Sequence, residues 1–225
     1  GGGAGGRGDK TMVEMVNLTR LDCAIGAATA MRSGVAQAAH HAAHRTAFGA
    51  RLADQPLMRN VLADLAVEAE AATTVALWLA ELTDRAAGGD ERADRLRRIA
   101  LAVTKYHVCK RGPSHAAEAL ECLGGNGYVE ESRMPRLYRE APLLSIWEGS
   151  GNVAALDVLR AMARQPQTLG VFLDEVRSAA GADRRLDRAI ERFEQTMTSI
   201  DPTDPDALQY LARRIVCLLY TSDAA

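Results

Sequence analysis

Apolar residues recur at steps of three and four along much of this chain, which is the period of an amphipathic helix. Residues 18–48 follow the pattern, with apolar positions at Leu21, Ile25, Ala28, Met31, Val35 and Ala39. Residues 55–84 follow it more strictly, in alternating steps of four and three, at Met58, Leu62, Leu65, Ala69, Ala72, Ala76 and Leu79. A seam of this kind, rich in alanine, predicts close packing in a left-handed helix bundle.

The later part of the chain also reads as helices separated by turns. A third helix is expected over 91–110, and Gly112-Pro113 should break or kink it before Ser114 starts a new helix to Leu123, because proline lacks the N–H that an interior position needs. The next helical pattern begins near Val153. Three further helices are predicted at 168–180, 183–200 and 205–219.

The start of the chain has a different character. Residues 1–9 are too rich in glycine to nucleate a helix, and the alternation in KTMVEMV over 10–16 predicts one short strand. Elsewhere the many alanines, leucines and arginines and the three phenylalanines favour helices over strands. The expected fold is therefore mainly α, a helical bundle with extra C-terminal helices and a short N-terminal strand.

Charge and cysteine usage exclude several classes of protein. The formal net charge of −2 creates no global basic field for nucleic acid or an anionic membrane. The four cysteines are widely spaced and fit neither a disulfide framework nor a thiolate metal site. We find no leader of the secretory type and no apolar run long enough to span a membrane. A reducing, cytoplasmic location is expected.

Three histidines, His40, His41 and His44, lie close together near the end of the first predicted helix. The pair His40 and His44 would share one helix face, as metal ligands do. No acidic or sulfur ligand stands beside them, and the helix dipole favours imidazoles near a C-terminus. No metal site is predicted.

The stretch from Glu121 to Arg160 concentrates glycines, aromatics and charges that packing alone does not require. Its motif LGGNGY places glycines after a helix, whereas dinucleotide fingerprints and P-loops place them between a strand and a helix. In IWEGSGN, Glu148 follows an apolar run and stands beside Trp147. Desolvation of this kind can raise a carboxylate's pKa and make it a usable base. The alternative is an exposed acid near a helix start, stabilised by the dipole.

The motifs LGGNGY, YREAP and IWEGSGN together resemble the C-terminal half of the acyl-CoA dehydrogenases, and within them the alkylation-response branch. The resemblance runs from about Gly5 to Arg160 and continues more weakly to about Arg214. It implies that an N-terminal helical domain and a central β domain precede this chain. It also implies boundaries at 1–16 for the remnant of that β domain, 17–164 for the helical bundle, 165–216 for additional helices and 217–225 for a tail outside the family.

The resemblance implies FAD as cofactor and assigns several residues to it. Arg45, Phe48 and Gln55 match positions that hold the pyrophosphate and adenine part, and the Gly124-Gly125 loop matches one that lies near the ADP portion across a subunit interface. Further matching positions are Glu121, Ser150 and Asn152, where glutamine, threonine and glutamine are usual in the family. These departures keep polar side chains of similar size.

The substrate implied by the resemblance is an acyl-CoA thioester, with Glu148 at the position of the catalytic base. Arg20 and Arg160 match positions near the substrate pocket, and Trp147 would form its wall beside the base. Asn17 stands where some members have an aspartate near the CoA moiety. A dimer or a homotetramer is implied as well, because a neighbouring subunit completes the flavin site in family members.

Two other functions remain open from the sequence. The first is an alkylation-response flavoprotein that binds duplex DNA with little dehydrogenase activity, although residues 161–225 hold eight arginines against ten acidic residues. Arg184, Arg185, Arg188 and Arg192 could still form a local basic stripe on a helix. The second is an inactive, purely structural bundle, which would leave the spacing of the flavin and Glu148 motifs unexplained.

Overall fold

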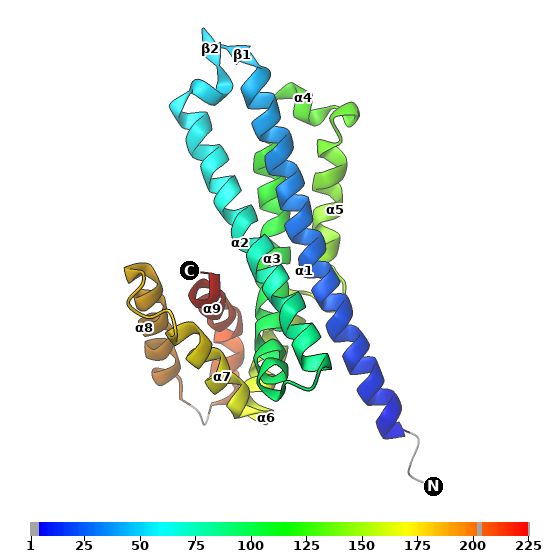
Figure 1. Cartoon of the computed structure of the whole chain (residues 1–225), viewed down its shortest axis with the longest axis vertical. Coiled ribbons are helices and arrows are strands. Elements are labelled where there is room, and N and C mark those ends of the chain that lie inside the picture. The colour runs from blue at the N-terminus through cyan, green and yellow to red at the C-terminus, as the bar shows by residue number, and fades with distance from the viewer. Residues whose placement is uncertain (1–4, 202–203, 225) are drawn as a thin grey trace.

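Helices dominate the computed structural model, which describes residues 5–201 and 204–224. Four long segments lie side by side in Figure 1, and successive ones run in opposite directions. They are α1 (Gly5–His44), α2 (Pro56–Ala87), α3 (Glu91–Glu121) and α5 (Met134–Ile146), the last continued by α6 (Gly151–Arg164). The mainly α bundle expected from the sequence is confirmed.

Shorter elements connect the bundle. A hairpin of β1 (Thr46–Ala47) and β2 (Ala50–Arg51), followed by the turn η1 (Leu52–Asp54), joins α1 to α2 at the top of Figure 1. At the same end, α3 is joined to α5 by α4 (Gly125–Tyr128) and by the turn η2 (Glu130–Ser132). Both connections therefore lie at one end of the bundle.

The predicted strand over 10–16 is wrong, because these residues belong to α1. The apolar residues of KTMVEMV are spaced so that they also form one side of a helix, and a short run continuous with a long helix gains helical hydrogen bonds at both ends. The helix also ends at His44 rather than at Phe48, whose φ of 54° belongs to the hairpin. Residues 1–4 of the glycine-rich start lie outside the described residues.

Small side chains make the contact between α1 and its neighbours. Ala24, Ala27 and Ala38 are at most 1% exposed, whereas Ile25, which the pattern placed on the buried face, is 38% exposed. In α2 the seam is confirmed from Leu65 to Leu79, since every predicted position in that interval is buried. Leu21, Ala28 and Met31 of the predicted face are buried as well, whereas Ala39 is exposed, so the pattern predicted for α1 is confirmed only in part. Alanines let helix backbones approach closely.

The helix α3 is the centre of the structure and packs against α1, α2, α5, α6, α7 and α9. The predicted break at Gly112-Pro113 is wrong, because α3 continues through Pro113 to Glu121. An interior proline costs about 3 kcal/mol. Burial of Cys109 before it and Ala116 after it offsets that cost. Ser114 does not cap a new helix, and its hydroxyl donates to the Arg111 carbonyl at 2.9 Å.

The three further predicted helices are present as α7 (Pro166–Arg177), α8 (Arg184–Thr198) and α9 (Pro205–Ala224). They form a second group of helices at the lower part of Figure 1, where α7 packs on α3 and α6, and α9 packs on α6 and α8. Ile215, Val216 and Leu219 of α9 are fully buried. Whether residues 217–225 lie outside the family stays a prediction, and Pro202 of the predicted turn lies outside the described residues.

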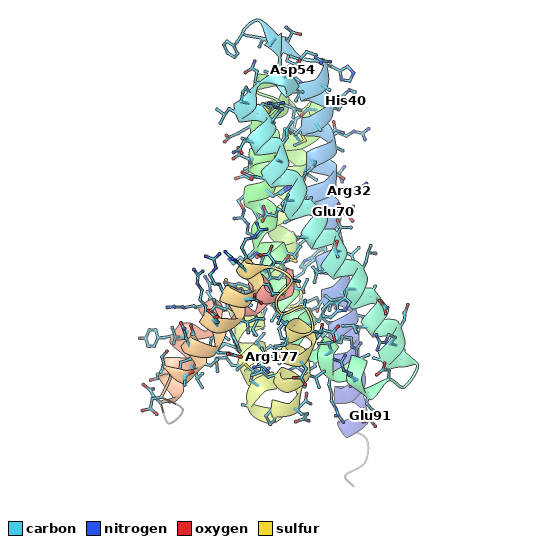
Figure 2. The ribbon with its side chains drawn as sticks, turned by 60° about the vertical axis from the view of Figure 1, so that its left-hand side comes forward. Arg32, His40, Asp54, Glu70, Glu91 and Arg177 are labelled. Atoms are coloured by element: carbon cyan, nitrogen blue, oxygen red, sulfur yellow. The ribbon has the colours of Figure 1, made fainter. Side chains whose placement is uncertain are left out.

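Charged side chains cover the outer faces, as Figure 2 shows for Arg32 on α1, Glu70 on α2 and Arg177 on α7. No described helix combines the length and the apolar character that crossing a membrane requires. The rings of His40 and His44 lie 4.4 Å apart. Within the described ranges, no group of three or more histidine, cysteine or acidic residues is placed to hold a metal ion.

Candidate active site

Glu148 lies in the tight turn between α5 and α6. Its φ of 57° is left-handed, which is unusual for a residue with a side chain, and Gly149 follows with a φ of 105°. A Cβ atom at Gly149 would lie 2.8 Å from the Cγ1 atom of Val153, so only glycine fits there. A left-handed non-glycine residue persists only where its surroundings hold it.

Two buried cations hold this turn. Arg20 of α1 donates from Nε to the Glu148 carbonyl at 3.1 Å. Lys105 of α3 donates from Nζ to the Ser145 carbonyl at 3.4 Å and also to the Gly149 carbonyl. Arg20 is 9% exposed and Lys105 is 1% exposed. The backbone on both sides of the Glu148 side chain is therefore fixed from neighbouring helices.

Glu148 itself lines a groove of about 410 Å³ between α1 and the end of α5. The other lining residues are Thr19, Asp22, Cys23, Leu144 and Trp147. Burial raises the pKa of the Cys23 thiol; Lys105 lowers it, and Glu148 and Asp22 raise it further. The groove therefore holds a neutral thiol, apolar surface and two carboxylates, of which Glu148 stands at the end of α5 beside Trp147.

Behind the turn, Asp157 of α6 gathers three arginines. Its carboxylate accepts from Arg20 at 2.7 Å, from Arg98 at 2.9 and 3.1 Å, and from Arg160 at 3.4 Å. Burial alone would raise the pKa of Asp157, but the hydrogen bonds and charges of Arg98 and Arg20 outweigh it, so the pKa is lowered. Because Arg20 also donates to the Glu148 carbonyl, this network fixes the backbone of the candidate base.

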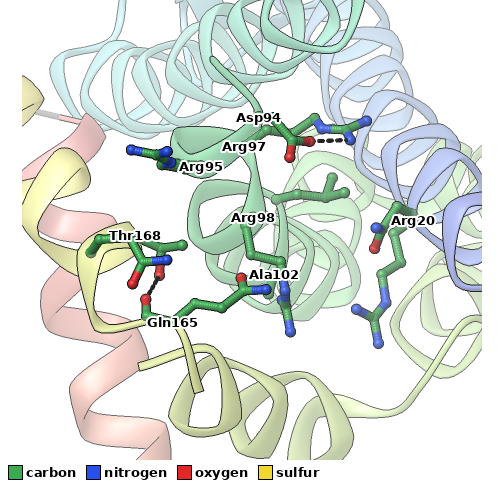
Figure 3. Close-up of a pocket in the computed structure, with 11 residues that line it drawn as sticks. Arg20, Asp94, Arg95, Arg97, Arg98, Ala102, Gln165 and Thr168 are labelled. Carbon is green, nitrogen blue, oxygen red and sulfur yellow. Dashed lines mark hydrogen bonds and ion pairs between the residues drawn. The ribbon is translucent and has the colours of Figure 1, made fainter. Parts of the chain in front are cut away.

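A second cavity of about 400 Å³ lies beside this network, between α1, α3 and the start of α7. Figure 3 shows Arg20 reaching it from α1, Arg98 from α3, and Gln165 and Thr168 from the opposite wall. The complete lining is Asn17, Arg20, Asp94, Arg95, Arg97, Arg98, Leu101, Ala102, Gln165, Gln167 and Thr168. The cavity is basic, and Asn17 and Arg20 face it rather than the groove of Glu148.

The predicted flavin residues Arg45, Phe48 and Gln55 come together at the hairpin. The Phe48 ring is 95% exposed. The Arg45 guanidinium is exposed and forms no ion pair within the described part of the chain. Gln55 donates from Nε2 to the Ala47 carbonyl at 3.0 Å and so braces the hairpin. An exposed guanidinium can bind phosphate oxygens, and an exposed aromatic ring beside it can stack on an adenine ring.

The glycine loop lies at the same end of the bundle. Glu121 ends α3 and is exposed, as are Gly124 and Gly125. Gly124 has a φ of 57° and lies in the turn between the end of α3 at Glu121 and the start of α4. At Gly127 a Cβ atom would lie 2.2 Å from the Leu120 carbonyl oxygen. Gly127 is therefore required by the chain's own packing.

The remaining predicted residues surround the Glu148 turn. Trp147 is 55% exposed. Ser150 precedes α6 and is exposed, and Asn152 accepts from Arg213 of α9 at 2.8 Å. The Arg160 side chain is 57% exposed although it pairs with Asp157.

The structure thus separates the predicted residues into two groups. Arg45 directly follows α1 and lies 25 residues beyond Arg20, which corresponds to about 37 Å at 1.5 Å per residue. One copy of the chain therefore does not bring the hairpin and Glu148 to the same spot.

The family to which the chain belongs follows from comparison with known proteins. Residues 6–163 match the model for the acyl-CoA dehydrogenase C-terminal domain. The chain belongs to the acyl-CoA dehydrogenase family. It is 42% identical to "Putative acyl-CoA dehydrogenase AidB" of Escherichia coli (strain K12) over 195 residues, which are 87% of this chain and 36% of AidB.

Two further comparisons, one of sequence and one of structure, are with Caenorhabditis elegans. Acyl-CoA dehydrogenase family member 11 is 30% identical over 197 residues, which are 86% of this chain and 32% of that protein. The crystal structure of ACDH-11 in complex with C11-CoA superposes with a TM-score of 0.88 at 25% identity, over 99% of this chain and 40% of the other. The chain spans about a third of the length of the curated relatives AidB and family member 11.

Sequence reasoning did not identify Asp157, Lys105 or Arg98. Lys105 could have been noticed, because it interrupts the apolar run Ile99–Val108 at the centre of a helix. Asp157 likewise stands alone among apolar residues of α6. Arg98 carried no such signal, since it lies within a run of charges that reads as a solvated face.

Proposed function

We propose that this chain is the C-terminal part of an FAD-dependent enzyme that dehydrogenates acyl-CoA thioesters, with Glu148 as the base. The observation that carries the proposal is the Glu148 turn, in which two cations fix the backbone while the carboxylate lines a groove beside Trp147. The C11-CoA complex of a relative with the same fold supports a thioester as ligand.

In the proposed reaction, residues of this chain orient the thioester and remove its α-proton. The α-proton of a thioester is only moderately acidic, so the base must be close and well aimed. The turn provides the aim, and Trp147 and Leu144 give the groove apolar walls that exclude water. FAD, when bound, supplies the acceptor for the hydride from the β-carbon.

The hairpin fits the phosphate and adenine portion of FAD. Arg45 offers an exposed guanidinium, unpaired among the described residues, for paired phosphate oxygens, and Phe48 offers an exposed ring. Glu121, Gly124 and Gly125 lie at the same end of the bundle, where exposed backbone at the two glycines permits close approach. Ser150 and Asn152 would contact the flavin near Glu148, and Arg20 and Arg160 would lie near the substrate.

The direct test is anaerobic mixing of the intact, flavin-loaded protein with acyl-CoA thioesters of several chain lengths. Bleaching of the oxidised flavin absorbance, with an enoyl thioester as product, is the expected result. A flavin that stays oxidised with every thioester would contradict the proposal.

We expect the intact protein to be a dimer or tetramer, because the two groups of predicted flavin residues lie about 37 Å apart along α1 and a second copy would unite them. Light scattering at several protein concentrations measures this. A monomer that retains bound flavin would refute the expectation.

Phe48→Ala tests the predicted contact of the hairpin with the flavin. It removes an exposed ring and should weaken flavin binding without unfolding the bundle.

Duplex DNA is a second candidate partner, suggested by the resemblance of the sequence motifs to the alkylation-response branch and by one feature of α8. Arg184, Arg185, Arg188 and Arg192 are all exposed on this helix. However, Arg185 pairs with Asp183, and ten acidic residues outnumber the eight arginines over 161–225.

We therefore expect weak, salt-sensitive DNA binding, since contacts to phosphates dominate non-specific affinity. Titration of a labelled duplex with the intact protein at low and physiological salt measures it, with Arg184→Ala/Arg188→Ala/Arg192→Ala as the comparison. Nanomolar binding at physiological salt that the triple variant abolishes would make DNA binding the preferred function.

A further inference from the structure

Lys105 is a fully enclosed cation whose partners are all carbonyl oxygens. It lies in the middle of α3 and is 1% exposed. In the described part of the chain it forms no ion pair, and its ammonium donates to the carbonyls of Ser145 and Gly149. Both carbonyls belong to the segment that carries Glu148, one before it and one after it. Among the described residues, the groups that accept hydrogen bonds from this buried charge are therefore those that flank the candidate base.

A buried ammonium is a costly way to satisfy two carbonyls, because the desolvation of an ion amounts to several kcal/mol. Part of that cost is offset by the position of Ser145 in the last turn of α5, where the helix dipole favours a cation. Burial lowers the pKa of Lys105, while Cys109, Cys23 and Glu148 act to raise it. Lys105 is thus close enough to Glu148 to interact with its charge as well as with the adjacent backbone.

The turn has few other restraints. Glu148 and Gly149 both have left-handed φ values, and Ser150 makes no side-chain capping bond to α6. A left-handed non-glycine residue is strained and persists only where its surroundings hold it. Among the described residues, the side-chain hydrogen bonds to Ser145, Glu148 and Gly149 come only from Arg20 and Lys105. Arg20 holds the carbonyl of Glu148, and Lys105 holds the residues on either side.

We propose that Lys105 is a positioning residue for Glu148: by holding the carbonyls of Ser145 and Gly149, it fixes the left-handed turn that directs the Glu148 carboxylate into the groove. The catalytic part of this inference rests on the proposed function of Glu148 as base. The structural part, that Lys105 holds the turn, stands independently of it.

The structural part is tested on the 225-residue chain in a Trp78→Phe background, where Trp147 is the single tryptophan. Lys105→Met keeps the length of the side chain and removes its donors and charge. We expect a shift in Trp147 emission and at least about tenfold faster hydrogen exchange of the amides of Trp147 and Ala154, which donate to the Leu143 and Ser150 carbonyls at 3.0 and 2.9 Å. The matched control is Thr104→Val, because Thr104 is buried beside Lys105 and its hydroxyl has no partner. It should leave both signals unchanged.

The catalytic part is tested on the intact, flavin-loaded protein. Lys105→Met should lower the rate of flavin reduction at saturating thioester by about 10²-fold, the scale expected for a misplacement of about 1 Å. The half-saturating thioester concentration should change much less, because Lys105 does not line the groove. Lys105→Gln keeps N–H donors without the charge and should restore part of the rate. It also serves as the informative variant if Lys105→Met does not fold.

Each result separates this inference from the proposed function. Unchanged Trp147 emission and exchange in the folded Lys105 variants would overturn the inference, even if the rate fell. Unchanged rates with a loosened turn would overturn its catalytic part. If the wild-type protein does not reduce its flavin, the proposed function fails, while emission and exchange still decide whether Lys105 holds the turn.

Discussion

Replacing Glu148 by glutamine should abolish most of the bleaching of the flavin by an acyl-CoA thioester while leaving the fold and the bound flavin in place. Glutamine is nearly isosteric and cannot accept the α-proton, and loss of a general base typically costs about 10²–10⁴-fold in rate. The turn itself should persist, because Arg20 and Lys105 hold backbone carbonyls rather than the Glu148 side chain. Stopped-flow absorbance of the flavin in the intact protein measures the effect.

The groove offers its own control. Asp22 also lines it and is exposed, so Asp22→Asn removes a carboxylate from the same groove. We expect Asp22→Asn to retain bleaching within a few-fold of wild type. Normal bleaching by Glu148→Gln would remove Glu148 from the mechanism and favour DNA binding or a non-catalytic role. Loss of bleaching in Asp22→Asn alone would assign the base to Asp22.

The helices of this chain could be predicted because their signals are local and repeated. The seam from Leu65 to Leu79 is buried, as its period predicts, and α3 ends at Glu121, just before the glycines of LGGNGY. The strand at 10–16 and the break at Pro113 were wrong for a shared reason. Each relied on a few residues, whereas the outcome depended on the long helix to which they belong.

The candidate site could be predicted only in part. The position of Glu148 in a turn before a new helix follows from the glycines around it, but the left-handed φ of Glu148 does not. Lys105 and Asp157 were not identified, because the partners that satisfy them in the interior, Ser145 and Gly149 for Lys105 and Arg20 and Arg98 for Asp157, lie 40 or more residues away in the chain. A period of three to four residues places a side chain on a face, and it does not specify which loop that face will meet.

Asp157→Asn should strongly destabilise this chain. Asp157 is 6% exposed and is the shared partner of Arg20, Arg98 and Arg160. Removing one member of a buried charge pair typically costs about 3–5 kcal/mol, because the remaining charge stays buried without compensation. Here that charge is Arg20, whose side chain is 11% exposed, whereas Arg98 and Arg160 are reached by solvent. Urea denaturation of the 225-residue chain at neutral pH, followed by circular dichroism, measures the free energy of unfolding.

A matched control distinguishes burial from charge. Asp94 pairs with Arg97 within α3, and the Asp94 side chain is 63% exposed. An exposed pair contributes about 0–1 kcal/mol, so Asp94→Asn should change the free energy of unfolding little. Equal effects of the two substitutions would show that burial of the Asp157 network contributes nothing to stability.

The pH dependence gives the Asp157 prediction a second, independent measurement. The pKa of Asp157 is lowered in the folded chain relative to about 3.9 in an unfolded chain. Above that unfolded value the carboxylate contributes its full stabilisation, and as the pH falls through the lowered pKa the contribution is lost. The difference in unfolding free energy between wild type and Asp157→Asn should therefore be constant at neutral pH and should shrink below about pH 4. A difference that stays constant into strong acid would show that the network does not depend on the ionised form of Asp157.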